Sequence, residues 1–148
     1  MHTPLGAFAL FVSAVIALAS STVALSAPVT MTFEGLGDFE YVREYYNGGY
    51  GGSGSGPGPT FGVSFPDGTY SSIDADDGGT GNFGGEPSGN TAVSFQQFGA
   101  WMNVSAGFSD GLSFYYSNPN GPNSIFIYDG IDGAGNLLAT LFLPMTAY

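Results

Sequence analysis

Hydrophobic and polar residues alternate over short runs along most of this chain, and Gly, Pro, Asn and Asp bound the runs. A period of two indicates β-strands, and no run has the spacing of a strong amphipathic helix. We expect six to eight strands, drawn from residues 29–34, 60–65, 69–73, 91–98, 101–106, 112–117, 124–128 and 137–143. This pattern predicts an all-β fold, an antiparallel β-sandwich or jelly roll.

The last two runs are apolar on both faces. Ile125 and Ile127 alternate with Phe126 and Tyr128, and residues 137–143 are apolar almost throughout. Such runs are typical of strands covered on both sides, so we expect both strands to be central. Residues 129–136 between them contain Asp-Gly turn chemistry, which predicts a hairpin with a loop longer than two residues.

Two Gly-rich stretches interrupt the strand pattern. Residues 48–59 contain too much Gly and Pro for a regular element and predict a long loop or a flexible segment. Residues 74–90 are also Gly-rich, but they carry several acidic side chains. Long loops inside a compact domain are usually functional or disordered.

The N-terminal residues have the features of a secretory signal peptide. An apolar stretch from about residue 5 to residue 18 is followed by small residues through Ala27. We expect residues 1–26 to be this signal and residues 27–148 to form one exported domain, because that length suits a single core. An uncleaved anchor is the alternative, but the apolar run is short for a membrane span.

Charge and composition remove many functional classes. The chain has twelve Asp and Glu against a single Lys or Arg, which is Arg43, and its net charge is −11. It has no Cys, and its one His, His2, lies in the predicted signal. Nucleic acid and anionic lipid are therefore excluded as expected partners, and disulfides, zinc, copper and haem find no suitable ligands.

The same inventory limits catalysis. A Ser-His-Asp triad, a Cys nucleophile, a Lys Schiff base and a P-loop each need a residue that the predicted exported domain lacks. Paired carboxylates of a glycoside hydrolase remain, with Glu34, Glu40, Glu44 and Glu86 as candidates. We expect a protein that is not an enzyme, with this hydrolase as a third hypothesis.

Carboxylates gather in places that suit calcium. Asp74, Asp76 and Asp77 concentrate oxygen ligands in a Gly-rich loop, although the spacing is not that of an EF-hand. A second group would pair Glu34 with Asp129 or Asp132 if the first strand and the last hairpin were neighbours. Structural Ca²⁺ is thus a predicted cofactor, against the alternatives of a solvated acidic loop and of Asp129 and Asp132 shaping their turn.

Aromatic residues make up 16% of the chain, and several adjoin Gly, Asn and Ser. A flat ring beside amides and carboxylates suits a sugar, whose C–H face stacks while its hydroxyls bond to polar groups. The alternative is that these rings are ordinary core or cross-strand residues. The candidate ligand-binding residues are Tyr45, Tyr46, Tyr50, Trp101, Tyr115 and Tyr116.

Several blocks also resemble a known group of proteins. They are residues 45–49, 54–65, 79–88, 106–108, 114–117, 128–130 and 138–141. Together they are similar to exported bacterial proteins that usually bear PEP-CTERM sorting tails. The resemblance implies export, recognition by an exosortase, and a place at the cell surface or in an exopolysaccharide matrix.

The tail itself, a Pro-Glu-Pro motif with an apolar helix and a basic end, does not occur before Tyr148. Either the sequence is a fragment that has lost the tail, and with it any membrane attachment and any final strands, or the protein is released. We favour a fragment, because ending so soon after an apolar strand would leave a sheet edge unexplained. The first functional hypothesis is a non-catalytic surface or matrix protein that binds extracellular polysaccharide. The second is a structural or adhesion module that binds a surface protein through the same aromatics.

Overall fold

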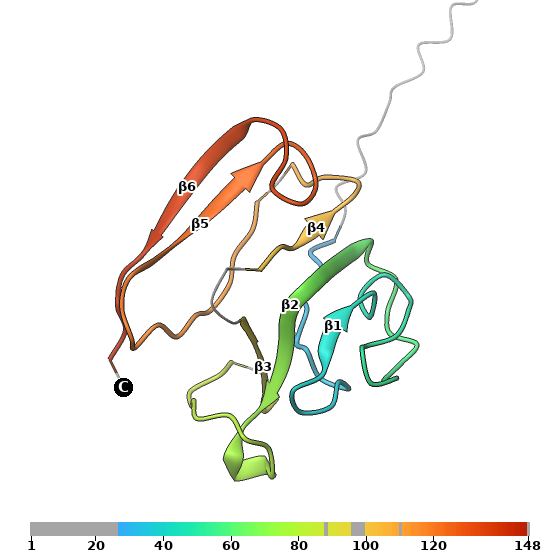
Figure 1. Ribbon diagram of the computed structural model, residues 1–148, viewed down its shortest axis with the longest axis vertical. Coiled ribbons are helices and arrows are strands. Elements are labelled where there is room, and N and C mark those ends of the chain that lie inside the picture. The colour runs from blue at the N-terminus through green and yellow to red at the C-terminus, as the bar shows by residue number, and fades with distance from the viewer. Residues whose placement is uncertain (1–26, 88, 96–99, 110, 148) are drawn as a thin grey trace, which may run out of the picture.

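A computed structural model describes residues 27–87, 89–95, 100–109 and 111–147 (Figure 1). The predicted signal, residues 1–26, lies outside this part of the chain, as do residues 96–98 of one predicted strand. The described residues contain six strands, all pairings between strands are antiparallel, and the one helix is a short 3-10 turn. The prediction of an all-β, sandwich-like single domain is confirmed.

The strands form two sheets. The first has the order β1-β2-β3, with β4 also pairing with β2, and the second is the hairpin β5-β6. In Figure 1 the hairpin stands beside β4, away from β1 and β3. The bounds are β1 Tyr41–Arg43, β2 Val63–Ile73, β3 Thr91–Phe95, β4 Asn103–Val104, β5 Asn123–Tyr128 and β6 Leu137–Leu143, with the 3-10 helix η1 at Ala75–Asp77.

The predicted strands are only partly correct. Residues 124–128 and 137–143 are confirmed, whereas residues 29–34 and 112–117 form no strand and β1 was not predicted. Met31 and Phe33 of residues 29–34 instead pack against the core without a strand ladder, and the Phe33 amide donates to the Tyr46 hydroxyl over 2.6 Å. The alternating pattern of this segment therefore indicated that alternate side chains pack inward, but it did not indicate that the segment pairs with another strand.

Residues 60–65 and 69–73, predicted as two strands, belong largely to the single strand β2. Tyr41 lies opposite Tyr70 but Arg43 lies opposite Phe65, so β2 bulges between these pairs. Gly68, at φ 116°, adopts a backbone conformation that favours glycine within the bulge. A bulge of this kind re-aims side chains, and here it brings Asp67 to Arg43.

The core lies beneath β1 and the first half of β2. Its buried apolar members are Leu36, Val42, Tyr46, Val63 and Phe65. Met102 and Val104, at and beside β4, pack against this cluster, as does Val93 from β3. The core is small and is built mainly by residues 31–65, so the packed interior of the domain lies around β1.

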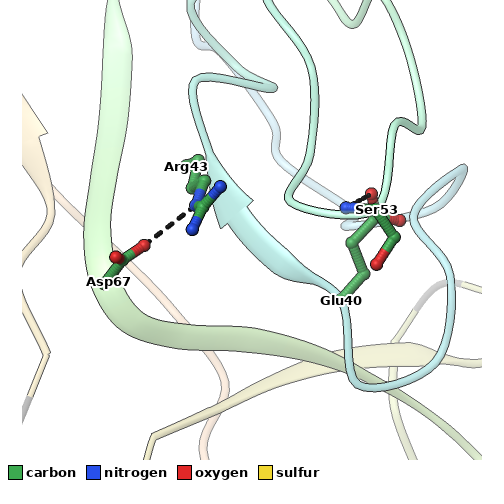
Figure 2. A network of polar contacts seen from close by, with 4 residues as sticks. All are labelled: Glu40, Arg43, Ser53 and Asp67. Atoms are coloured by element: carbon green, nitrogen blue, oxygen red, sulfur yellow. Dashed lines mark hydrogen bonds and ion pairs between the residues drawn. The ribbon is translucent and has the colours of Figure 1, made fainter.

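The buried carboxylate of Glu40 holds the first Gly-rich loop in place. Glu40 is 1% exposed, and its Oε1 accepts hydrogen bonds from the Ser53 and Ser55 amides at 2.8 and 3.0 Å. Its Oε2 accepts from the Gly37 amide at 2.7 Å and from Ser55 Oγ at 2.5 Å. Figure 2 shows Glu40 reaching Ser53 on one side of β1. The loop predicted as either long or flexible is thus folded around a carboxylate.

Glycine is required at the centre of this loop. A Cβ atom at Gly51 would overlap the Glu40 carboxylate and lie 2.8 Å from Leu36 Cδ2. Burial alone would raise the pKa of Glu40, but the hydrogen bonds from Ser55, Gly37 and Ser53 outweigh it and lower the pKa from 4.5 to about 2. Glu40 is therefore ionised at neutral pH without a cationic partner.

The hairpin β5-β6 is attached mainly through its two ends. Near the turn, Asn103 Nδ2 donates to Asp132 Oδ1 at 2.7 Å, and the Asp132 amide donates to Asn103 Oδ1 at 2.9 Å. At the open end, Asn123 Nδ2 donates to Asn118 Oδ1 at 2.7 Å, and Asn118 Nδ2 donates to the Leu143 carbonyl at 3.3 Å.

The prediction that both hairpin strands are central and covered was wrong. Among the described residues each of these strands pairs with one other strand, and Phe126, Leu138 and Phe142 are 53%, 62% and 67% exposed. The apolar pattern correctly located the strands, but it could not show that the core would form elsewhere, on residues 31–65. The predicted turn over residues 129–136 is confirmed.

Replacing Glu40 by Gln tests the role of the buried carboxylate. At pH 7 we expect Glu40→Gln to lower the free energy of unfolding by about 2 to 3 kcal/mol, because an amide NH₂ would face a backbone donor. The measurement is urea unfolding followed by circular dichroism. Glu44→Gln is the matched control, since Glu44 is exposed and its carboxylate accepts a side-chain hydrogen bond from Asn47 Nδ2.

The pH dependence gives a second readout of the same group. The unfolded chain binds the Glu40 proton more tightly than the folded protein, so the stabilisation is complete above pH 4.5 and is lost as the pH falls through about 2. Between pH 4.5 and about 2, the free energy of unfolding should fall by up to about 3 kcal/mol more in the wild type than in Glu40→Gln. Parallel stability curves for the two proteins between pH 5 and 2 would contradict the assignment.

Candidate functional site

Three aromatic rings form a cluster on the surface of β1 and β2. The Tyr70 ring lies 5.7 Å from the Phe39 ring and 5.8 Å from the Tyr41 ring, measured between centroids. Tyr70 is 7% exposed, whereas Phe39 and Tyr41 are 55% and 41% exposed. We call Phe39, Tyr41 and Tyr70 the aromatic platform, because a buried ring supports two rings that face solvent.

The platform is built by the sequence around β1. Glu40 and Val42 are buried, while their neighbours Phe39, Tyr41 and Arg43 are exposed. This period of two follows from the pleat of an extended chain. Glu40 and Val42 anchor β1 from below, so the three residues between and beside them are displayed outward.

Phe39 and Arg43, at the two ends of this segment, both have left-handed backbone conformations, with φ of 54° and 46°. Such conformations are strained for non-glycine residues and persist only where the surroundings enforce them. The Phe39 amide donates to the Ser71 carbonyl at 3.0 Å, and the Glu40 carboxylate accepts from the Gly37 amide, two residues before Phe39, at 2.7 Å. Residues in enforced strained conformations often belong to binding sites.

The only Arg of the chain borders the platform. Arg43 Nε donates to Asp67 Oδ1 at 2.9 Å (Figure 2). The guanidinium carbon of Arg43 lies 5.4 Å from the centroid of the Tyr41 ring. The Arg43 and Asp67 side chains are 47% and 69% exposed, and an ion pair this exposed contributes little to stability. It does place a planar donor and an acceptor beside the exposed rings.

The first Gly-rich loop lies against the same surface. The Gly52 amide donates to the Tyr41 carbonyl at 2.7 Å, and a Cβ at Gly52 would lie 2.9 Å from Tyr41 Cβ. Glu40, which holds Ser53 and Ser55, therefore also positions the loop that flanks Tyr41. The buried Glu40 carboxylate and the exposed platform are thus connected through this loop.

The six aromatics predicted to bind ligand do not form one site in the structure. Tyr46 is 3% exposed and belongs to the core, and the half-buried Tyr45 packs against it and donates to the Glu34 carbonyl at 3.3 Å. Trp101 is 45% exposed and packs edge-on against Tyr128 at 6.4 Å.

The remaining three are exposed. Tyr50 is 57% exposed and lies in the first Gly-rich loop, while Tyr115 and Tyr116 are 82% and 39% exposed and lie in a segment without strand structure. The sequence prediction missed Phe39, Tyr41 and Tyr70. The available signal was the alternation over residues 39–43, which was too short to stand out beside the longer strands.

Several predicted calcium ligands accept hydrogen bonds from protein groups. Glu34 Oε1 accepts from the Asn90 and Thr91 amides, both at 3.0 Å. Asp129 accepts from the Asn136 amide at 2.7 Å and from Asn136 Nδ2 at 2.9 Å, and these bonds, the side-chain bond first, lower the pKa of Asp129. Asp132 pairs with Asn103.

Asp74, Asp76 and Asp77 lie at and beside η1, and Asp74 makes no side-chain hydrogen bond to the helix that it precedes. Among the described residues, no three acidic or histidine side chains are close enough together to hold a metal ion. Calcium therefore stays a prediction from the sequence.

Asp38 is a further acidic residue that the sequence did not single out. Its Oδ2 accepts from Thr80 Oγ1 at 2.6 Å and its Oδ1 from the Ile73 amide at 2.8 Å. These two bonds lower the pKa of Asp38, the Thr80 bond most. Asp38 thus joins the second Gly-rich loop to the segment before β1, much as Glu40 joins the first.

An apolar groove of about 650 Å³ lies on another part of the surface. The N-terminal segment contributes Val29 and Met31 to its walls, and Phe108 and Leu112 are among the residues opposite. Its side chains are mostly apolar, whereas binding sites for polar ligands add a few convergent polar groups to such a surface. The platform, with Arg43 and Asp67 at its edge, is the better site for a hydroxylated ligand.

Comparison with known proteins adds no relative. No protein-family model, no curated protein and no solved structure matches the chain. The described residues also include no helix that is long and apolar enough to cross a membrane.

Proposed function

We propose that this protein is a non-catalytic, exported surface or matrix protein that binds neutral carbohydrate through the aromatic platform. The observation that supports this most is the exposure of Phe39 and Tyr41 on a buried Tyr70, beside the Arg43–Asp67 pair. The C–H face of a sugar stacks on such rings, and a carboxylate and a guanidinium together accept from and donate to its hydroxyls.

Charge favours a neutral sugar over an acidic one. The chain has a net charge of −11, and its one Arg is already paired with Asp67. An anionic polysaccharide would be repelled by the protein as a whole, and Arg43 alone would not offset this. Binding of a neutral glycan should consequently change little with salt concentration.

Export and a surface or matrix location are part of the same proposal. The signal-peptide pattern of residues 1–26 and the resemblance to PEP-CTERM proteins support them. Adhesion to a protein partner is the second hypothesis, since exposed Tyr and Arg also serve as interface anchors. The glycosidase hypothesis is weaker, because Glu34 and Glu40 are engaged by backbone amides and Glu40 is buried.

Single substitutions on a panel of neutral polysaccharides and oligosaccharides test the platform. We expect Tyr41→Ala and Phe39→Ala each to raise the dissociation constant about tenfold, because each removes one stacking ring. Phe126→Ala is the matched control, since it removes a ring that is 53% exposed on β5, away from β1 (Figure 1) and in no predicted binding set. Titration calorimetry at low and high salt is the measurement.

Two results would overturn the proposal. One is equal glycan affinity in Tyr41→Ala, Phe39→Ala and the wild type. The other is the absence of binding to every neutral glycan, together with capture of a protein partner that Tyr41→Ala abolishes, which would establish the adhesion hypothesis. Sugar release that a single Glu→Gln substitution abolishes would establish the enzyme.

The calcium prediction has an independent test. If Ca²⁺ binds the folded protein through Asp74, Asp76 and Asp77, the unfolding temperature should rise with calcium concentration, because binding to the folded state alone stabilises it. Thermal unfolding in chelator and in millimolar calcium measures this. Asp76→Asn should remove the rise, and an unchanged unfolding temperature in the wild type would reject the site.

A further inference from the structure

The strand β6 presents an unprotected edge. It pairs with β5 on one side, and within the described residues no strand pairs with its other side. Edge strands in soluble proteins are usually short, charged, bulged or interrupted by Pro. β6 is seven residues long, has no charged residue, and exposes Leu137, Leu138 and Phe142 by more than half.

The sequence of β6 is close to a palindrome. Thr140 is its central residue, and the pairs at equal distances from it are Ala139 with Leu141, Leu138 with Phe142, and Leu137 with Leu143. If a second, identical strand runs antiparallel with its Thr140 opposite this Thr140, all the remaining positions pair an apolar residue with an apolar residue.

The ends of β6 favour this register. Pro144 follows the strand directly and cannot donate to a ladder, and Asn136 before the strand is bound in the turn by Asp129. If two copies of β6 pair antiparallel along all seven residues, the two-fold axis between them must therefore lie at Thr140. A contact of this kind is isologous and closes at two copies.

Electrostatics also favours this surface for self-association. Two copies with a net charge of −11 repel each other over most approaches. The strands β5 and β6 contain no charged side chain, so the hairpin offers an approach in which no carboxylate of either strand is desolvated.

We propose that β6 is a dimerisation strand: two copies of this chain pair edge to edge, antiparallel, with Thr140 opposite Thr140. The two hairpins then form one continuous four-stranded sheet. A lone two-stranded hairpin is marginally stable, so the added strands stabilise an element that in one copy is held mainly by its ends. This inference is independent of the glycan proposal, because the platform lies on β1 and β2.

Charge reversal at the axis is the first test. Thr140→Lys and Thr140→Glu each place like charges opposite each other, so each should raise the dimer dissociation constant about tenfold or more in sedimentation equilibrium. Mixing the two variants should restore a heterodimer. Ser124→Lys, on the exposed face of β5, is the control that adds the same charge to the same hairpin without altering the paired edge.

Cysteine cross-linking tests the register without depending on affinity. The chain has no Cys, so a single introduced thiol reports one position. Directly opposite residues in an antiparallel pair have Cα atoms about 4.5 to 5.5 Å apart, within the range that a disulfide spans. Thr140→Cys should therefore form a disulfide-linked dimer on mild oxidation, while Leu138→Cys and Ser124→Cys should not.

The oligomeric state and the cross-linking pattern together decide for or against the dimer. A concentration-dependent dimer, lost in Thr140→Lys and in Thr140→Glu and regained in their mixture, supports the proposal. A wild type that stays monomeric at all concentrations overturns it and assigns the edge to another partner. Open-ended aggregation, or equal cross-linking at positions 138 and 140, overturns the closed two-fold register.

Discussion

Hydrogen bonds from backbone amides to carboxylates are the interaction on which this fold depends. The chain has eleven more acidic than basic side chains, so a buried carboxylate cannot rely on a cation. Glu34, Asp38 and Glu40 each accept hydrogen bonds from backbone amides far along the sequence. A hydrogen bond to a charged group is stronger than one between neutral groups. Loops without regular structure thereby become fixed parts of the domain.

This arrangement connects the interior to the surface. Glu40 is buried because the loop closes over it, and the closed loop then lies against Tyr41. Tyr41, Phe39 and the only Arg face outward because Glu40 and Val42 face inward. The candidate binding surface thus follows from the anchoring of β1, and a change in the buried carboxylate would move the rings above it.

The hairpin β5-β6, in contrast, is apolar in sequence but exposed in the structure. It contains some of the most apolar segments of the chain, yet the core forms on residues 31–65 and leaves both hairpin strands exposed. Hydrogen bonds of Asn103, Asp132 and Asn118 hold its ends, but they do not cover its faces. A small domain with one core has few elements left to cover a second sheet.

The sequence by itself determined the strand-rich, antiparallel class, the hairpin of residues 124–143 and the two Gly-rich loops, because period-two alternation and turn chemistry are local properties. It did not reveal β1, the single long strand β2 or the platform. These depend on which distant amides reach Glu40, and on a bulge that brings Asp67 to Arg43. Among the aromatics, Tyr46 and Tyr41 have the same side chain, and only tertiary packing decides that one is buried and the other faces solvent.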